Sequence, residues 1–268
     1  MVMRVRRFMI LCVALSVLAP GLASAKEDNQ LNQLKQRADK GDAEAQVALA
    51  EMYLEGAGVR PDPAKAAKWH RKAAEQGHAR AQLLLGIDYI NGSGVKTDKV
   101  EGFRWISKAA AQQLAEAQIA AAKCFAKGEG VHQDPEQALK LYHQAAEQGS
   151  AEAEFQVANC YFDGSGTPKD LEDGVAWVTR AANRGYAPAQ NRLGYCYLKA
   201  EGVPKDLVQA HKWFNLAASK GGSAMYEYRV NVARVEAQLT HEQLTQAEKL
   251  AHEFKPSAPP PPAASASK

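Results

Sequence analysis

A set of residues recurs every 36 positions through most of this chain. Tryptophan marks four of the five copies, at Trp69, Trp105, Trp177 and Trp213, and Leu141 takes its place in the third. One glycine returns at the same interval, at Gly58, Gly94, Gly130, Gly166 and Gly202. A period of about 20 to 50 residues is typical of solenoids, in which similar units stack in a row. The spacing therefore predicts five stacked units over residues 41–221.

Each unit is predicted to contain two helices joined by a glycine turn. In the first copy, apolar residues from Ala45 to Tyr53 follow the spacing of one helical face, which predicts a helix over residues 43–55. Asp62 is a suitable N-cap for a second helix, which Gly77 would end. One such hairpin cannot bury its own apolar face, whereas five stacked copies can. We therefore expect an all-α fold: a right-handed α-solenoid superhelix of five 36-residue helix-turn-helix repeats with capping helices.

The first 25 residues have the layout of a bacterial signal peptide. Three arginines precede an apolar stretch, and Ala23-Ser24-Ala25 supplies a small-residue cleavage site. The apolar stretch is short for a transmembrane helix, although an uncleaved anchor is the alternative. Removing the leader leaves 30 basic and 30 acidic residues, a balance that does not favour nucleic-acid binding. We expect export to the periplasm or beyond, without stable membrane insertion after cleavage.

The segments that flank the repeats are predicted to be caps and a tail. Residues 26–40 are expected to form an N-terminal capping helix, and residues 222–254 two C-terminal capping helices, the second of which begins with a capping box at Thr240–Gln243. The residues expected to cover the open end of the stack are Tyr226, Val230 and 232–235. Residues 255–268 are rich in proline, alanine and serine, a composition that predicts a disordered tail.

Three cysteines, Cys124, Cys160 and Cys196, occupy one equivalent position in three repeats. Equivalent residues of stacked helices lie roughly one helix diameter apart, about 10 Å. A disulfide requires Cα atoms less than about 7 Å apart. We therefore interpret all three as buried, small apolar groups, and a thiol-redox role is the alternative.

The repeated unit, A-x-A-Q-x-x-L-G/A-x-x-Y-x-x-G-x-G-V…D…A…W…A-A-x-x-G, resembles the Sel-one-like repeat, a relative of the tetratricopeptide repeat. The resemblance covers residues 41–221 and implies a scaffold that binds a protein or peptide. Exported bacterial members that look like this chain are associated with envelope assembly, host-cell interaction or toxin neutralisation. Cysteine-rich relatives carry one disulfide per repeat. This chain lacks that cysteine pair, so the penicillin-binding activity claimed for some of them is not implied.

No enzyme motif emerges from the sequence. The G-x-S-x-G, H-E-x-x-H and C-x-x-C patterns and the phosphate-binding loop are absent, and none of the seven histidines shows the spacing of metal ligands. We therefore expect neither catalysis nor a cofactor or metal. An envelope hydrolase acting on cell-wall peptides is kept as an alternative.

The resemblance to tetratricopeptide proteins implies that the first helix of each repeat lines a concave, partner-binding face. The residues expected there are Arg80, Leu83, Ile87, Asn91, Lys123, Lys127, Phe155, Asn159, Phe162, Asn191, Tyr195 and Lys199. Their apolar members suit either a groove floor or packing against the next repeat. The four tryptophans, by contrast, are expected in the core. The sequence thus predicts a monomeric, exported scaffold whose partner is a protein or peptide.

Overall fold

The computed structural model describes residues 20–258 except 221 and 223, and within these residues the chain forms thirteen helices and no strand. The first helices of the repeats are α2 (Ala43–Glu55), α4 (Ala79–Asn91), α6 (Ala115–Lys127), α8 (Ala151–Asp163) and α10 (Ala187–Lys199). The second helices are α3 (Pro63–Glu75), α5 (Lys99–Ala111), α7 (Pro135–Glu147), α9 (Leu171–Asn183) and α11 (Leu207–Ser219). The flanking helices are α1 (Pro20–Asp39), α12 (Met225–Glu236) and α13 (His241–His252).

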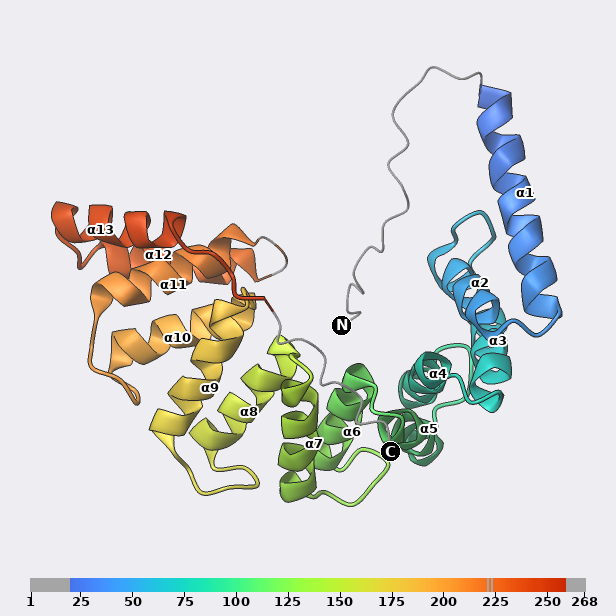
Figure 1. The fold of residues 1–268 in the computed structure, drawn as a ribbon, viewed down its shortest axis with the longest axis horizontal. Helices are drawn as coiled ribbons and strands as arrows, with labels where there is room; N and C mark the ends of the chain where they lie inside the picture. Colours follow the sequence, from blue (N-terminus) through green and yellow to red (C-terminus); the bar gives the residue numbers. More distant parts are fainter. Residues whose placement is uncertain (1–19, 221, 223, 259–268) are drawn as a thin grey trace.

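The helices stack in chain order into an open arc (Figure 1). Each first helix packs against the second helix of its own repeat and, from the second repeat on, against that of the repeat before it. In Figure 1, α2 and α4 lie toward the inner side of the arc, and α3 and α5 lie toward its outer side. The prediction of an all-α solenoid is confirmed.

Capping residues fix where the helices begin and end. Asp62 accepts a hydrogen bond from the backbone N–H of Lys65 at 3.0 Å, and the four equivalent aspartates cap the later second helices in the same way. Gly94, with φ of +70°, packs so closely on the Pro63 carbonyl that an added Cβ would lie 2.0 Å from its oxygen. Glycine is therefore required where the turn of one repeat rests on the second helix of the repeat before it.

A ladder of side-chain amides, each with one buried glutamine, joins the two helices within each of the first three repeats. Gln46 donates to the carbonyl of Ala38 at 2.9 Å and accepts a hydrogen bond from Gln76 at 2.8 Å. The same glutamine–glutamine bond recurs one and two repeats later, between Gln112 and Gln82 and between Gln148 and Gln118. In the fourth repeat Glu154 and Arg184 replace this pair and form an ion pair.

The tryptophans are less uniformly buried than predicted. Trp105 and Trp213 are buried in the core, whereas Trp69 and Trp177 are only partly buried. The Lys72 ammonium lies 3.9 Å from the Trp69 ring centroid, and the Arg180 guanidinium lies 4.1 Å from that of Trp177. A cation therefore lies over each of these two rings, as Lys108 does over the buried Trp105 at 4.1 Å.

The C-terminal cap differs from its prediction in detail. The capping box at the start of α13 is present. Val235 is fully buried, but Tyr226 is 80% exposed and Val230 40% exposed, so the expectation that these two residues cover the stack is wrong. The reason is that α12 packs on α11 through the opposite face, which carries Tyr228 and Asn231.

The two ends of the chain are only partly described. The predicted leader falls largely in residues 1–19, outside the described part, and its proposed cleavage site lies within α1. Beyond α13, residues 255–258 are extended and contact the end of α9, while residues 259–268 of the predicted tail lie outside the description.

Candidate partner-binding surface

The first helices of consecutive repeats meet on one side of the stack, which we call the inner face. It is formed by Glu44, Val47, Glu51, Leu54, Glu55 and their equivalents at intervals of 36 residues. Arg80 of α4 pairs with Glu51 of α2 at 2.8 Å, and Lys123 of α6 pairs with Glu152 of α8 at 2.6 Å. These bridges join first helix to first helix, as expected for the shorter, inner side of a curved stack.

The two ion pairs order the inner face more than they stabilise the fold. Their side chains are between 29% and 42% exposed, and surface pairs of this kind contribute about 0–1 kcal/mol. Arg80 and Lys123 were both predicted to contact a partner, and both are already engaged by a neighbouring repeat. Ile87 and Asn159 occupy the repeat position of Glu51 and Lys123, and neither forms such a bridge within the described chain.

Two predicted contact residues belong to the core instead. Leu83 is 5% exposed and packs in a cluster with Ile106, and Phe162 is 4% exposed and packs against α9. Gly174 makes room for the Phe162 ring, since a Cβ there would lie 2.7 Å from it. Between groove floor and packing, the structure therefore assigns Leu83 and Phe162 to packing.

The middle of the inner face carries an aromatic pair that remains reachable. The rings of Phe155 and Tyr186 lie 5.5 Å apart at 59°, and both residues are partly buried. Burial raises the pKa of Tyr186 to about 12, with a smaller contribution from the charge of Glu152, so its hydroxyl keeps its proton and can donate. Asn159 is also partly buried on this face.

At the C-terminal end, part of the inner face is covered by the cap. The Tyr195 hydroxyl donates to Asn231 of α12 at 2.8 Å, and the Asn231 amide donates to Asn191 at 3.0 Å. The Tyr195 ring also meets Phe214 edge-on at 5.1 Å. Asn231 was missed by sequence reasoning, although it stands 36 residues after Tyr195 and the period itself pointed to it.

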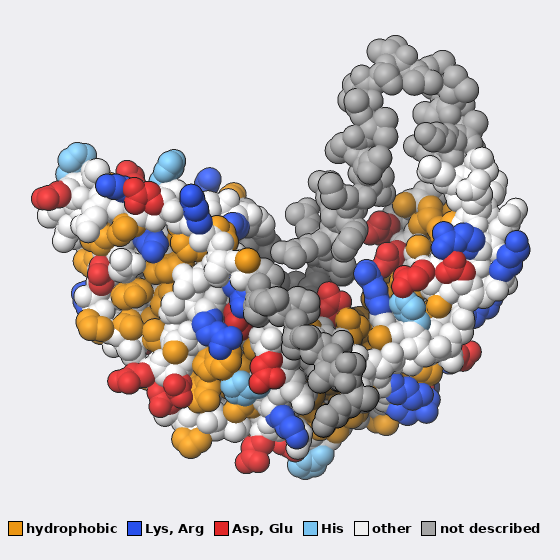
Figure 2. Space-filling view, in the orientation of Figure 1, with side chains coloured by type: hydrophobic (Ala, Val, Ile, Leu, Met, Phe, Trp, Pro, Cys, Tyr) orange, Lys and Arg blue, Asp and Glu red, His pale blue; other side chains and the backbone are white. Residues whose placement is uncertain are grey.

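The remaining predicted residues lie along the rim of the inner face. Asn91, Lys127 and Lys199 stand at the last residue of α4, α6 and α10, and all three are exposed. Figure 2 shows basic and acidic side chains interspersed over α2 and α4 rather than gathered by sign. A partner on this surface would meet apolar and amide groups in the middle and charges of both signs at the rim.

The cysteines are placed for packing. Cys124, Cys160 and Cys196 are free and buried. Burial raises the pKa of each thiol to about 11, which leaves almost no thiolate at neutral pH. Since the thiolate is the reactive form, this environment does not favour the redox alternative.

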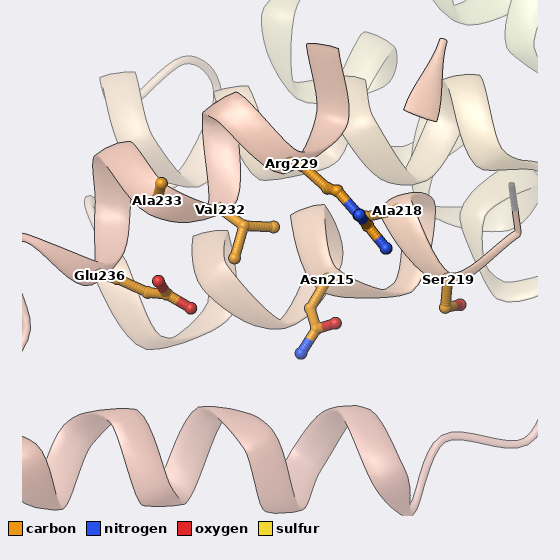
Figure 3. Close-up of a pocket in the computed structure, with 7 residues that line it drawn as sticks. All are labelled: Asn215, Ala218, Ser219, Arg229, Val232, Ala233 and Glu236. Carbon is orange, nitrogen blue, oxygen red and sulfur yellow. The ribbon is translucent and has the colours of Figure 1, made fainter. Parts of the chain in front are cut away.

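The described residues offer little support for catalysis. They contain no group of three or more His, Cys, Asp or Glu side chains able to hold a metal ion. His70 lies 2.7 Å from Asp88, but both are buried between α3 and α4, beyond the reach of a substrate. A shallow cleft of about 280 Å³ between α11 and α12 is lined by Asn215, Arg229 and Glu236 among others (Figure 3), without a histidine or cysteine. None of the described helices is long and apolar enough to cross a bilayer.

Comparison with known proteins gives five consecutive matches to the Sel1 repeat, at residues 43–78, 79–114, 115–150, 151–186 and 187–222. The chain is similar to a Sel1 repeat protein from Oxalobacter formigenes, with 33% identity, a TM-score of 0.67, and 77% of this chain and 85% of that chain covered. It is also similar to c5321, a protective antigen of uropathogenic Escherichia coli strains, with 28% identity and a TM-score of 0.52. That alignment covers 87% of this chain and 59% of the antigen. A search of the curated proteins found no match.

Proposed function

The chain belongs to the Sel1 repeat family, and from that premise we propose that it is an exported, non-catalytic scaffold that binds a protein or peptide on its inner face. Sel1 repeats generally mediate protein interactions. The finer role, in envelope assembly, host interaction or toxin neutralisation, depends on the identity of the partner.

The aromatic pair on the inner face carries this proposal. Phe155 and Tyr186 are partly exposed side by side, and within the described chain no hydrogen bond engages the Tyr186 hydroxyl or the Asn159 side chain. Aromatic groups with a nearby polar donor are enriched where proteins bind one another, because they bury a large area with little loss of side-chain entropy. The ion-paired Lys123 and Glu152 lie beside them as a charged border.

Export and a monomeric state complete the proposal. Export is supported by the leader-like residues 1–25 of the sequence. A monomeric state is supported by the capped ends of the stack, where α1 covers the first repeat and α12 with α13 covers the last. Capped ends leave the inner face as the broad surface open to a partner.

Asn159→Lys is the most direct test of the inner face. The residue is partly exposed and engages no other side chain through a hydrogen bond within the described chain, so a long charged side chain should block the surface and leave the fold intact. The matched control is Gln144→Lys on α7, which adds the same charge at an exposed position of a second helix. Each protein is immobilised and used to capture proteins from a bacterial envelope fraction.

The expected result is a partner retained by the wild type and by Gln144→Lys and lost with Asn159→Lys, then reproduced with the purified partner by calorimetry. Equal binding to all three proteins would place the contact elsewhere and overturn the proposal. Circular dichroism and melting temperature confirm that both variants are folded.

A further inference from the structure

The five residues that follow α13 and Glu253 form a strap. Residues 254–258 run back from the cap to the turn between α9 and α10 (Figure 1). The Phe254 ring meets Trp213 edge-on at 5.5 Å, and the Ser257 N–H donates to the carbonyl of Asn183 at 2.8 Å. Arg184 donates from Nη1 to the carbonyl of Ala258 at 3.1 Å. The strap is therefore seated by two hydrogen bonds to its backbone and one aromatic contact.

Arg184 stands where the first three repeats have glutamine and the fifth has Lys220. Gln76, Gln112 and Gln148 each donate from the amide nitrogen to the glutamine of the ladder and to a backbone carbonyl, which uses both of its N–H groups. Arginine carries five N–H donors in a fixed fork. Arg184 therefore holds Glu154 through Nε at 2.9 Å and still has Nη1 available for the strap.

The two hydrogen bonds recognise the backbone of the strap, while the contact with Trp213 recognises an aromatic side chain. One N–H and one carbonyl of the strap are bonded, and Pro256 lies over Gly185, where even an added Cβ would remain 3.6 Å from the proline ring. A proline-containing chain is extended before it binds, so less conformational entropy is lost on docking.

We propose that the α9–α10 turn, with Asn183, Arg184, Gly185 and Trp213, is a binding site for an extended, proline-containing protein segment, and that the chain's own strap is its built-in occupant. A segment of this kind on a partner must displace the strap. The apparent affinity of such a segment equals its intrinsic affinity multiplied by the fraction of molecules in which the strap is released. The site adjoins the inner face, because Tyr186 follows Gly185 in the same turn, but it uses none of the predicted contact residues and is tested by a different probe.

The test releases the strap in the full-length protein, so that binding of a free peptide to the α9–α10 turn can be measured. In the double variant Phe254→Ala, Ser257→Pro, residue 257 has no N–H to donate to Asn183, so the strap is released. The matched control, Phe254→Ala, Ser257→Ala, keeps that N–H. The probe is a fluorescein-labelled peptide of residues 252–262, and its binding is measured by fluorescence anisotropy.

The peptide is expected to bind the released variant, Phe254→Ala, Ser257→Pro, at least about tenfold more tightly than the wild type, with the control in between, because the strap no longer competes. Adding Glu154→Gln and Arg184→Gln restores the glutamine pair of the other repeats and should abolish this gain. Equal affinity for wild type and released variant, no binding to the released variant, or no effect of the glutamine pair would each overturn the proposal. Circular dichroism confirms that every variant retains its helices.

Discussion

Arg184 donates a hydrogen bond from Nε to Oε2 of Glu154 at 2.9 Å, in the place where three other repeats join two glutamines. The carboxylate is fully buried. Arg180 lies 3.1 Å from its other oxygen, at ion-pair distance but without the geometry of a hydrogen bond. A charged pair has thus replaced a neutral one within a single architecture, and the neutral version is available in the same molecule for comparison.

Replacing only one member of this pair is expected to be costly. Arg184→Gln leaves the buried Glu154 with Arg180 as its one cationic neighbour among the described residues, and breaking a buried pair in this way costs about 3–5 kcal/mol, less whatever Arg180 recovers. Replacing both residues by glutamine restores the ladder and should recover most of the loss. Denaturant unfolding of the two single variants and the double variant measures the coupling. Additive losses would show that the two residues do not act as a pair.

Ala200→Gly is expected to stabilise the protein. Ala200 ends α10 with φ of +58°, where the other first helices of the repeats end on glycine. A left-handed backbone costs a residue with a Cβ about 1–2 kcal/mol, part of which glycine gives back through its larger unfolded-state entropy. A rise in the urea midpoint with an unchanged slope would support this, whereas a lower midpoint would contradict it. Gly164→Ala, at the equivalent end of α8, should show the reverse effect.

The tryptophans should differ in their contribution to stability. Trp105 is buried, so Trp105→Ala is expected to cost about 3–5 kcal/mol. Trp69 is partly exposed beneath Lys72, and Trp69→Ala should cost less, because less area is removed from contact. Chemical denaturation of both variants gives the comparison. Equal losses would mean that the cation covers the Trp69 ring as effectively as apolar packing does.

Stability is expected to fall at alkaline pH. The folded state raises the thiol pKa of Cys124, Cys160 and Cys196 from 9.0 to about 11 by burial. Above pH 9 the unfolded chain therefore loses these protons while the folded chain keeps them, so the free energy of unfolding declines as pH rises toward 11. Unfolding curves at about pH 8, 9 and 10 measure the decline. A triple Cys→Ala variant should show a shallower one, and an identical slope would exclude the thiols as its source.

The same thiols should resist alkylation. Iodoacetamide at about pH 8 is expected to leave Cys124, Cys160 and Cys196 unmodified in the folded protein and to modify all three in denaturant, because the thiolate is both scarce and buried. Mass spectrometry of the reacted protein counts the modified sites. Rapid modification of any one of them in the native state would revive a redox role.

The fold followed from the period, because a 36-residue unit with an N-cap and a glycine turn allows few arrangements other than stacked hairpins. The resemblance to tetratricopeptide repeats indicated which helices would line the inner face but not the accessibility of each residue on it. Leu83 and Phe162 occupy inner-face positions yet are buried, since their exposure depends on the size of neighbours such as Gly174 in another helix.

Other features lay outside the repeat pattern. Tyr186 stands at a helix N-cap whose equivalents are His78, Leu114 and Ser150, so nothing in the pattern marked it as a partner for Phe155. The strap has no counterpart in any repeat. It is held in part by Arg184, and the sequence alone does not show why arginine replaces glutamine there, because the reason is its contact with the strap.

In a solenoid each unit touches only its neighbours, so the stack can fray from its ends one hairpin at a time. The strap breaks that rule, because its bonds to Asn183 and Arg184 join positions 74 residues apart. The fifth repeat and both capping helices lie between the two residues joined by each of these bonds. None of these elements can therefore separate from the stack until the strap is released. We therefore expect this end of the molecule to melt as one cooperative block, and hydrogen exchange should report similar opening energies for α10, α11 and α13.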